Sequence, residues 1–419
     1  MSTALLTRPG TDALSVLGAD VEVPTDSGAT VRYANFDVAA SAPCLRAAAD
    51  AVNALLPSYA SVHRGAGVLS RRCTLAYERA RETVADFLGC GPDHTVVFTR
   101  NTTDATNLLA HALPAGTTVV TFAAEHHANL LPWPSVVRLP LPPTPGAAVA
   151  AVEAALRGGP GRRLVAVTGA SNVTGELWPV RRIAAVAHRY GARVLLDAAQ
   201  LAAHQPVDIG SLGVDYVVLS GHKLYAPFGT GVLAGRSDWL DAAAPYLRGG
   251  GATGQVGDAP GDVRWHTGAA RHEAGTPNLL GAVALAAVCA ALDGTDRAAL
   301  TAGEDALLTR LRRGLDAVAG VHELSLFGPD HPRVGIVSFA VEGLDSATVA
   351  ARLSSGYGIG VRDGLFCAHP LTRHLLSRVP GVPPTTAVRA SLGLGTTTGD
   401  VDRLLTGVAE TVARAGVSG

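Results

Sequence analysis

Short apolar runs rich in β-branched residues alternate with segments of helical period through the first three hundred residues of this 419-residue chain. Near-continuous apolar strands separated by helices indicate a mostly parallel β-sheet with helices on both faces. We therefore expect an α/β fold, in which ligands bind at the carboxyl ends of the strands. The expected strands are His94–Phe98, Thr118–Phe122, Leu164–Thr168, Arg193–Asp197, Tyr216–Ser220 and Gly231–Ala234.

The pattern changes after about residue 295, where longer helices and fewer strands follow. We expect a large domain over residues 31–295, a smaller α+β domain over residues 296–419, and an N-terminal segment over residues 1–30 that packs with the small domain. The small domain is predicted to contain helices at Ala299–Val318, Ser346–Leu353 and Gly399–Ala415, strands at His331–Val341, Gly358–Arg362 and Thr386–Leu394, and a polar loop at Leu371–Thr385.

Composition excludes several classes of partner. With 34 basic and 35 acidic residues, the chain gives no reason to expect nucleic acid or a membrane surface. The longest apolar stretch, Leu279–Leu292, is shorter than the about 20 residues that a membrane span needs, so it predicts a buried helix. No secretory signal is visible at the N-terminus. The five cysteines form no CxxC pair, which argues against a disulfide framework or a metal site and favours a reduced, cytoplasmic setting.

Lysine occurs once in the whole chain, at Lys223, and every other basic side chain is arginine or histidine. A lysine amine can form an imine with a carbonyl compound, whereas an arginine guanidinium stays protonated and cannot. Lys223 follows the expected strand Tyr216–Ser220 through a glycine-containing turn, in the segment SGHKLYAPFGTG. An isolated lysine in a loop is usually a solvated surface residue. The neighbouring segments decide between the two interpretations.

Asp197 ends the strongly apolar strand RVLLD, where a carboxylate is costly unless a positive group faces it. A protonated pyridine nitrogen is such a group, and enzymes that use pyridoxal 5'-phosphate (PLP) characteristically place an Asp there. The alternative is an ordinary helix N-cap. Together, Lys223 and Asp197 predict a PLP site at the ends of two strands.

Three further strand ends carry groups that suit the same cofactor. Thr102 and Thr103 begin a helix after the first strand, where backbone N–H groups and hydroxyls can bind a phosphate, and Ser220 and His222 stand beside Lys223. His126 follows another strand and can stack on a pyridine ring. Each pattern alone could be a helix cap or a structural histidine. Their combination at strand ends is what predicts the site.

With these motifs in place, the chain resembles the class V aminotransferase group of fold-type I PLP enzymes, and within it the cysteine desulfurase/selenocysteine lyase branch. The resemblance covers nearly the whole chain, and SGHK is its most specific motif. The matching segments are YASVHRG (Tyr59–Gly65), RNTTDATN (Arg100–Asn107), EHHANLLPW (Glu125–Trp133), SNVTGELWPV (Ser171–Val180), DAAQ (Asp197–Gln200), SGHKLYAPFGTG (Ser220–Gly231), RHEAGTPN (Arg271–Asn278), VRDGLFCAHPL (Val361–Leu371) and VRASLGLGTTTGDVD (Val388–Asp402).

The resemblance implies a role for each matched residue. Lys223 would be the Schiff-base lysine, Asp197 the partner of the pyridine nitrogen and His126 the stacking residue. Thr276 would reach the phosphate across a dimer interface, which implies a homodimer. Arg389 would bind the substrate carboxylate. The remaining implied contacts are Asn172 and Gln200 to the phenolic oxygen, Thr102, Thr103, Ser220 and His222 to the phosphate, and His63 and Arg64 to the amino-acid substrate.

Cys367 decides the reaction that the resemblance implies. In desulfurases of this branch, a cysteine on the matching loop takes the substrate sulfur as a persulfide and leaves alanine, and a sulfur-acceptor protein then becomes a partner. Here His369 lies two residues after the cysteine, and imidazole neighbours are typical of activated thiols. The chain departs from the family where Leu365 and Phe366 replace two histidines before the cysteine, and where Leu394 and Gly395 replace a Tyr-Asn pair.

These departures make the surroundings of the thiol more apolar and leave alternatives open. One is a PLP-dependent carbon–sulfur lyase, epimerase or aminotransferase that acts on a larger amino acid in specialised metabolism. Another is a buried structural Cys367, and a third is a non-catalytic protein that keeps the fold. A nicotinamide site at Gly249–Gly254 (GGGATG) is rejected, because no convincing strand precedes it and no helix follows it.

Overall fold

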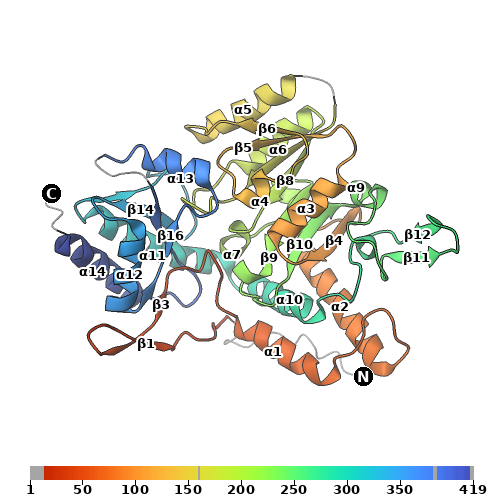
Figure 1. Cartoon of the computed structure of the whole chain (residues 1–419), viewed down its shortest axis with the longest axis horizontal. Coiled ribbons are helices and arrows are strands. Elements are labelled where there is room, and N and C mark those ends of the chain that lie inside the picture. Colours follow the sequence, from red (N-terminus) through yellow and green to blue (C-terminus); the bar gives the residue numbers. More distant parts are fainter. Residues whose placement is uncertain (1–13, 159–160, 381–384, 416–419) are drawn as a thin grey trace.

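The computed structural model describes residues 14–158, 161–380 and 385–415. A seven-stranded sheet lies at the centre of its larger part (Figure 1), in the order β4-β10-β9-β8-β7-β5-β6. β10 alone runs opposite to the other six strands of this sheet, so the prediction of a mostly parallel sheet is confirmed. The strands are β4 (His94–Thr99), β5 (Thr118–Phe122), β6 (Val136–Leu139), β7 (Arg163–Thr168), β8 (Arg193–Asp197), β9 (Tyr216–Ser220) and β10 (Gly231–Arg236).

Helices cover both faces of this sheet, because successive residues of each buried strand point to opposite sides. Val165 and Val167 of β7 belong to one core cluster with α5, α6 and α10, whereas Leu164 and Ala166 belong to another with α3 and α9. The helices are α1 (Arg46–Leu55), α2 (Val68–Phe87), α3 (Thr102–Ala112), α4 (His127–Leu130), α5 (Pro145–Arg157), α6 (Val180–Arg189), α7 (Leu201–His204), α8 (Ile209–Leu212), α9 (Ser237–Ala242) and α10 (Leu279–Asp293).

The apolar stretch Leu279–Leu292 forms α10, whose side chains are mostly buried against the sheet and its neighbouring helices. Among the described residues, no single helix has the length and hydropathy needed to cross a bilayer. Helix α10 and the following α11 (Arg297–Asp316) meet that test only when they are counted together, and the chain bends by 89° between them. The boundary predicted near residue 295 falls at this bend, and the division into domains stays a prediction.

A second, antiparallel sheet has the order β13-β14-β17-β16, and it packs with helices α11, α12 and α14 in a core cluster of its own. The prediction of a loop from Leu371 was wrong in its first part, because α13 (His369–Leu376) buries Leu371 and Leu375 at helical spacing. The elements are β13 (Val321–Glu323), β14 (Ile336–Val341), α12 (Ser346–Tyr357), β16 (Arg362–Gly364), β17 (Ala387–Ser391) and α14 (Thr398–Arg414).

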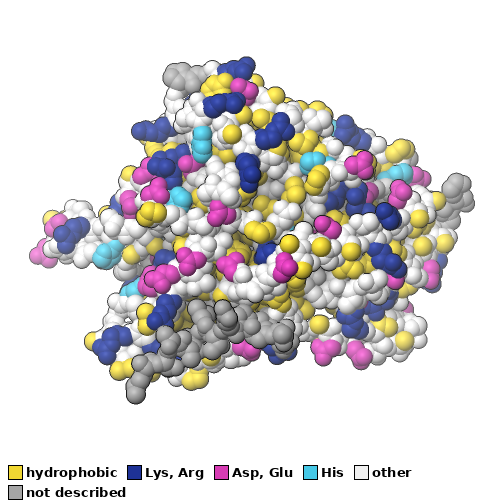
Figure 2. Space-filling view, turned by 180° about the vertical axis from the view of Figure 1, so that it is seen from behind, with side chains coloured by type: hydrophobic (Ala, Val, Ile, Leu, Met, Phe, Trp, Pro, Cys, Tyr) yellow, Lys and Arg dark blue, Asp and Glu magenta, His cyan; other side chains and the backbone are white. Residues whose placement is uncertain are grey.

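Short elements complete the fold. From residue 14 onward, the predicted N-terminal segment contacts α12, since Asp26 N donates to Ser355 O at 2.8 Å; residues 1–13 of it lie outside the described range. The hairpin of β11 (Thr253–Val256) and β12 (Val263–Trp265) projects at the right of Figure 1. Basic and acidic side chains are interspersed on the face in Figure 2. The remaining strands are β1 (Glu22–Pro24), β2 (Thr30–Arg32), β3 (Ala34–Asn35) and β15 (Ile359–Gly360).

Candidate active site

Parallel strands bring the predicted strand-end residues to one edge of the large sheet. Thr168 at the end of β7 pairs in register with Asp197 at the end of β8, and Asp197 pairs with Val218 of β9. Two residues after Val218, β9 ends at Ser220 and continues into a 3-10 turn over Gly221–Lys223. The spacing of the acid and the lysine is therefore set by the backbone hydrogen bonds of three adjacent strands.

Lys223 occupies the end of a turn that requires glycine at its start. A side chain at Gly221 would place Cβ only 2.7 Å from Thr230 O, so the backbone can turn here only without one. Desolvation and the charge of Arg389 lower the pKa of Lys223, Asp197 and Cys367 oppose that shift, and the resulting pKa is about 8. The amine thus lies within electrostatic reach of the acid, the arginine and the cysteine that were predicted to share its site.

Asp197 is 4% exposed, and its carboxylate accepts a hydrogen bond from Ala199 N at 2.9 Å. Burial raises the pKa of Asp197, and the charge of Lys223 partly offsets that rise. Within the described part of the chain, neither side chain makes an ion pair with the other or with any third residue. Asp197 and Lys223 attract each other but are not in contact. This arrangement suits a third group that lies between them and binds both.

His126 is held at the start of α4, where its Nδ1 accepts a hydrogen bond from Ala128 N at 3.1 Å. Burial, together with the positive charges of Lys223, His127 and Arg389, lowers the pKa of His126 to about 3. The imidazole is therefore neutral at physiological pH. A neutral, half-buried ring beside Lys223 can stack on a flat aromatic group.

The predicted phosphate residues meet at the start of α3. Thr102 N donates to Ser220 Oγ at 2.8 Å, and the Thr102 and Ser220 hydroxyls are also 2.8 Å apart. The Thr103 side chain is exposed, and its hydroxyl has no hydrogen-bond partner among the residues described. His222 lies on the other side of the turn, with Nδ1 3.4 Å from Ser41 Oγ. The structure thus brings Thr102, Thr103 and Ser220 together at a helix N-terminus, which favours an anion.

The side-chain amides of Asn172 and Gln200 form hydrogen bonds to backbone carbonyls at the site. Asn172 Nδ2 donates to Phe366 O at 2.7 Å, and Gln200 Nε2 donates to Ala39 O at 2.9 Å. Both residues are buried. Their predicted contacts with a cofactor oxygen stay predictions, because the structure shows these amides bound to the backbone.

Arg389 reaches the site from β17 of the second sheet. It is 3% exposed, and its guanidinium donates to Asn172 O at 3.0 Å and to Asp37 Oδ1 at 3.2 Å, while Nε has no partner within the described chain. Burial lowers the pKa of Arg389 to about 10, and Asp37 opposes that shift. The guanidinium therefore stays charged at neutral pH, with an unused donor that a carboxylate can accept.

Cys367 is exposed on the loop between β16 and α13, and its carbonyl accepts a hydrogen bond from His127 N at 2.8 Å. The His369 ring packs edge-on against the His127 ring, with 4.5 Å between the centroids. His369 therefore packs on the residue whose backbone holds Cys367, and an activating role of His369 stays a prediction. The exposed thiol excludes the alternative of a buried structural cysteine.

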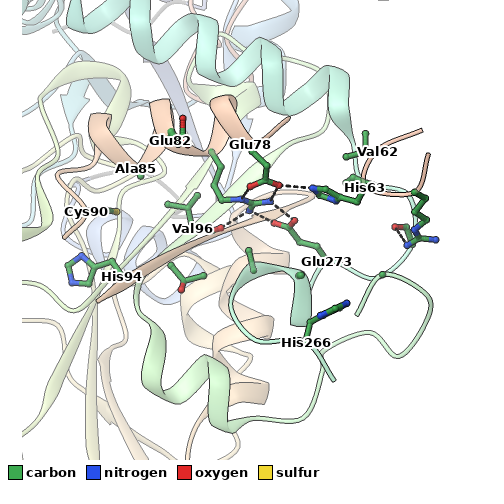
Figure 3. A pocket seen from close by; sticks show the side chains of 18 of the residues that line it. Val62, His63, Glu78, Glu82, Ala85, Cys90, His94, Val96, His266 and Glu273 are labelled. Carbon is green, nitrogen blue, oxygen red and sulfur yellow. Dashed lines mark hydrogen bonds and ion pairs between the residues drawn. The ribbon is translucent and has the colours of Figure 1, made fainter. Parts of the chain in front are cut away.

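His63, Arg64 and Thr276 lie elsewhere in this single chain. His63 Nε2 is 2.8 Å from Glu78 Oε1, and the ring points toward Glu78 in a pocket of about 540 Å³ (Figure 3). Arg64 donates to Gly275 O at 3.0 Å, one residue before the exposed Thr276. The structure thus groups these three residues with one another and not with Lys223.

Two further residues at the site were not predicted from the sequence. Glu125 is fully buried beside the site, where it accepts from Thr168 N at 3.0 Å and from Asn129 Nδ2 at 2.8 Å. Desolvation and the nearby Asp197 raise the pKa of Glu125 to about 8, although the hydrogen bonds from Asn129 and Thr168 oppose the shift. Its place three residues after the strand that ends at Phe122 was a signal in the sequence. For Asp37, the partner of Arg389, the sequence contains no such signal, because only tertiary contacts bring the two residues together.

No group of three His, Cys, Asp or Glu side chains in the described residues is arranged to hold a metal.

Comparisons with known proteins agree with this geometry. Residues 34–404 match the family Aminotransferase class-V. A cysteine desulfurase from Klebsiella pneumoniae (strain 342) is 38% identical over 363 residues, which cover 84% of this chain and 86% of that protein. A probable cysteine desulfurase from Vibrio cholerae is 35% identical, with coverage of 84% and 87%.

Solved structures show the same fold. A cysteine desulfurase from Escherichia coli matches with a TM-score of 0.79 at 32% identity, and one from Thermococcus onnurineus with 0.80 at 32% identity. Each comparison covers 91% of this chain and 95% of the other. The chain is therefore an enzyme with the fold-type I architecture, and it belongs to the class V aminotransferase family.

Proposed function

We propose that this enzyme is a PLP-dependent cysteine desulfurase that takes sulfur from L-cysteine, or from a related amino acid, and leaves alanine. The observation that carries the proposal is the exposed Cys367, whose carbonyl is held by His127 N at 2.8 Å and whose neighbour Phe366 packs its ring against Arg389. The similarity to cysteine desulfurases over 84% of the chain supports it.

The residues at the strand ends fit PLP. A neutral imidazole at His126, an unpaired amine at Lys223 and an unpaired acid at Asp197 match the ring, the aldehyde and the ring nitrogen of that cofactor. The free Thr103 hydroxyl and the start of α3 match its phosphate. When bound, PLP withdraws electrons from the amino acid and so weakens bonds next to its α-carbon.

The chain's own groups would supply the remaining chemistry. Arg389 binds the substrate carboxylate through its unused donor. With a pKa of about 8, Lys223 keeps a neutral fraction that can accept a proton from the substrate and return it. The Cys367 thiolate forms a bond to the substrate sulfur while the carbon–sulfur bond breaks. The electron pair of the broken bond stays with the carbon, which takes up a proton. The products are a Cys367 persulfide and alanine.

The test is sulfide and alanine production from L-cysteine by the PLP-loaded enzyme, compared with the Cys367→Ala variant. We expect sulfur release to fall by at least roughly a hundredfold in the variant, because the nucleophile is gone, while cofactor binding is unchanged. Turnover of another amino acid that persists in Cys367→Ala would contradict the proposal. That result would favour the lyase, epimerase or aminotransferase alternative, which the apolar Leu365 and Phe366 support.

A homodimer is part of the same proposal. Thr276, His63 and Arg64 form a group away from Lys223, so they could serve a site only across an interface with a second copy. Mixed dimers of Lys223→Ala and Thr276→Ala subunits test this. If Thr276 acts across the interface, each mixed dimer holds one intact site and regains activity. No recovery on mixing would place Thr276 outside the partner's site.

The exposure of Cys367 also supports a sulfur-acceptor protein as a partner, because a persulfide there would be open to a second thiol. A reduced, cytoplasmic setting suits the five free cysteines and belongs to this proposal. The test of that accessibility is the rate at which a small-molecule thiol takes sulfur from the Cys367 persulfide, compared between the folded and the denatured enzyme.

A further inference from the structure

The loop that carries Cys367 holds two consecutive residues in a left-handed backbone conformation. Phe366 and Cys367 both have a φ of 53°, and among the described residues other than glycine only His63 and Tyr225 share a positive φ. This conformation is unfavourable for residues with a side chain, and it persists only where surrounding contacts hold it. The loop therefore depends on its contacts with other elements.

Those contacts come from the loops that follow the large sheet. Asn172 Nδ2 donates to Phe366 O at 2.7 Å, and His127 N donates to Cys367 O at 2.8 Å. Each carbonyl of the two left-handed residues is thus held by a different segment. The position of the thiol follows from these two hydrogen bonds.

The Phe366 ring is 6% exposed and packs against Arg389, whose Cζ lies 5.3 Å from the ring centroid. A cation that is shielded from water gains from an aromatic face. A protonated imidazole in this place would repel the guanidinium, whereas phenylalanine attracts it. Asn172 closes the arrangement, because its carbonyl accepts a hydrogen bond from Arg389 at 3.0 Å.

We propose that Phe366 is a positioning residue that couples recognition of the substrate carboxylate at Arg389 to the placement of the Cys367 thiol. Its ring orients the guanidinium, and its backbone carries the left-handed turn into the cysteine. This inference rests on the proposed function for the role of the thiol. The part of the inference that concerns carboxylate binding does not depend on the proposed function, because it applies to any amino acid that binds at Arg389.

The test compares Phe366→Leu, which removes the ring, with Phe366→Tyr, which keeps it. The control is Phe339→Leu, the same substitution in the core next to β17, at a residue that pairs with Val388 and not with Arg389. Binding of L-alanine is followed by the change in visible absorption of the PLP-loaded enzyme, so it does not depend on sulfur release. The kcat for sulfur release from L-cysteine is measured separately.

We expect Phe366→Leu to weaken L-alanine binding about tenfold, as for a cation–π contact shielded from water, and to lower kcat. Phe366→Tyr should restore both quantities, and Phe339→Leu should leave L-alanine binding unchanged. In an Arg389→Lys background, Phe366→Leu should weaken binding by less than about twofold, because its effect acts through the guanidinium.

The inference is overturned if Phe366→Leu binds L-alanine as the unmodified enzyme does, if Phe366→Tyr behaves like Phe366→Leu, or if the effects of Phe366→Leu and Arg389→Lys are additive. These outcomes are separate from failure of the proposed function. An enzyme that releases no sulfur but shows the expected binding pattern would refute the desulfurase assignment and support the carboxylate half of the inference.

Discussion

The two sides of the candidate active site are built differently. Asp197 and Lys223 stand at the ends of neighbouring strands, where a ladder of backbone hydrogen bonds fixes their positions. Cys367 stands on a left-handed loop that depends on single hydrogen bonds from Asn172 and His127. A substitution on the strand side should therefore change the chemistry without moving the backbone. A substitution on the loop side should change the geometry without altering the cofactor site.

Asp197→Asn is the sharpest test of the strand side. The amide keeps the shape of the acid and its hydrogen bond from Ala199 N, but it cannot hold a proton on the cofactor's ring nitrogen. We expect the cofactor to remain bound and kcat to fall roughly a hundredfold, as for loss of one electrostatic stabiliser in a buried site. Steady-state kinetics and visible absorption measure the two effects. Loss of kcat together with loss of the cofactor would show that the acid holds the site together instead.

Asn172→Ala probes the loop side. Because its side chain holds Phe366 O, we expect sulfur release to fall about tenfold, the size of one buried hydrogen bond. Cofactor affinity should stay within about twofold, since Asn172 Nδ2 is bound to the backbone. Titration of the apo-enzyme with PLP, set beside kcat, checks this. A large loss of cofactor affinity would show that Asn172 helps to hold the cofactor, and it would contradict the division of the site into a strand side and a loop side.

Glu125→Gln should have the smallest effect on activity, and it tests how the strand side is buried. The pKa of Glu125 is raised to about 8 in the folded chain, so the folded state holds a proton that the unfolded state loses at about its usual pKa. The resulting stability is complete below the unfolded pKa and is lost as pH rises toward 8. We expect the glutamine variant to lose this part of the pH dependence in denaturant unfolding. An unchanged slope of unfolding free energy against pH would show that Glu125 is not protonated.

The strand side could be predicted from sequence because its information is local. An apolar run ending in Asp197, or followed by Ser220 and Lys223, marks both a strand and its end, and parallel pairing then brings the ends together. The α/β fold and the mostly parallel sheet were confirmed on the same basis. Glu125 also follows a strand end, but its burial depends on Asn129 and Thr168 N, which no local pattern connects to it.

The loop side could not be predicted in the same way. The resemblance placed Cys367 near the substrate, but the left-handed turn at Phe366 and the contact of its ring with Arg389 join residues that are far apart in the chain. The part of α13 from Leu371 onward was predicted as a loop, because Pro370 and polar residues masked the helical spacing of Leu371 and Leu375. The roles predicted for His63, Arg64 and Thr276 could not be checked in the same way, because under the proposed homodimer they require a second copy of the chain.

The central claim is that Lys223 holds PLP opposite Asp197. The most direct measurement is borohydride reduction of the PLP-loaded enzyme, followed by mass spectrometry of its peptides. Because the chain contains one lysine, we expect the pyridoxyl label on the peptide with Lys223, and no label in a folded Lys223→Ala variant. A folded, PLP-saturated enzyme that carries no label at Lys223 would contradict the account.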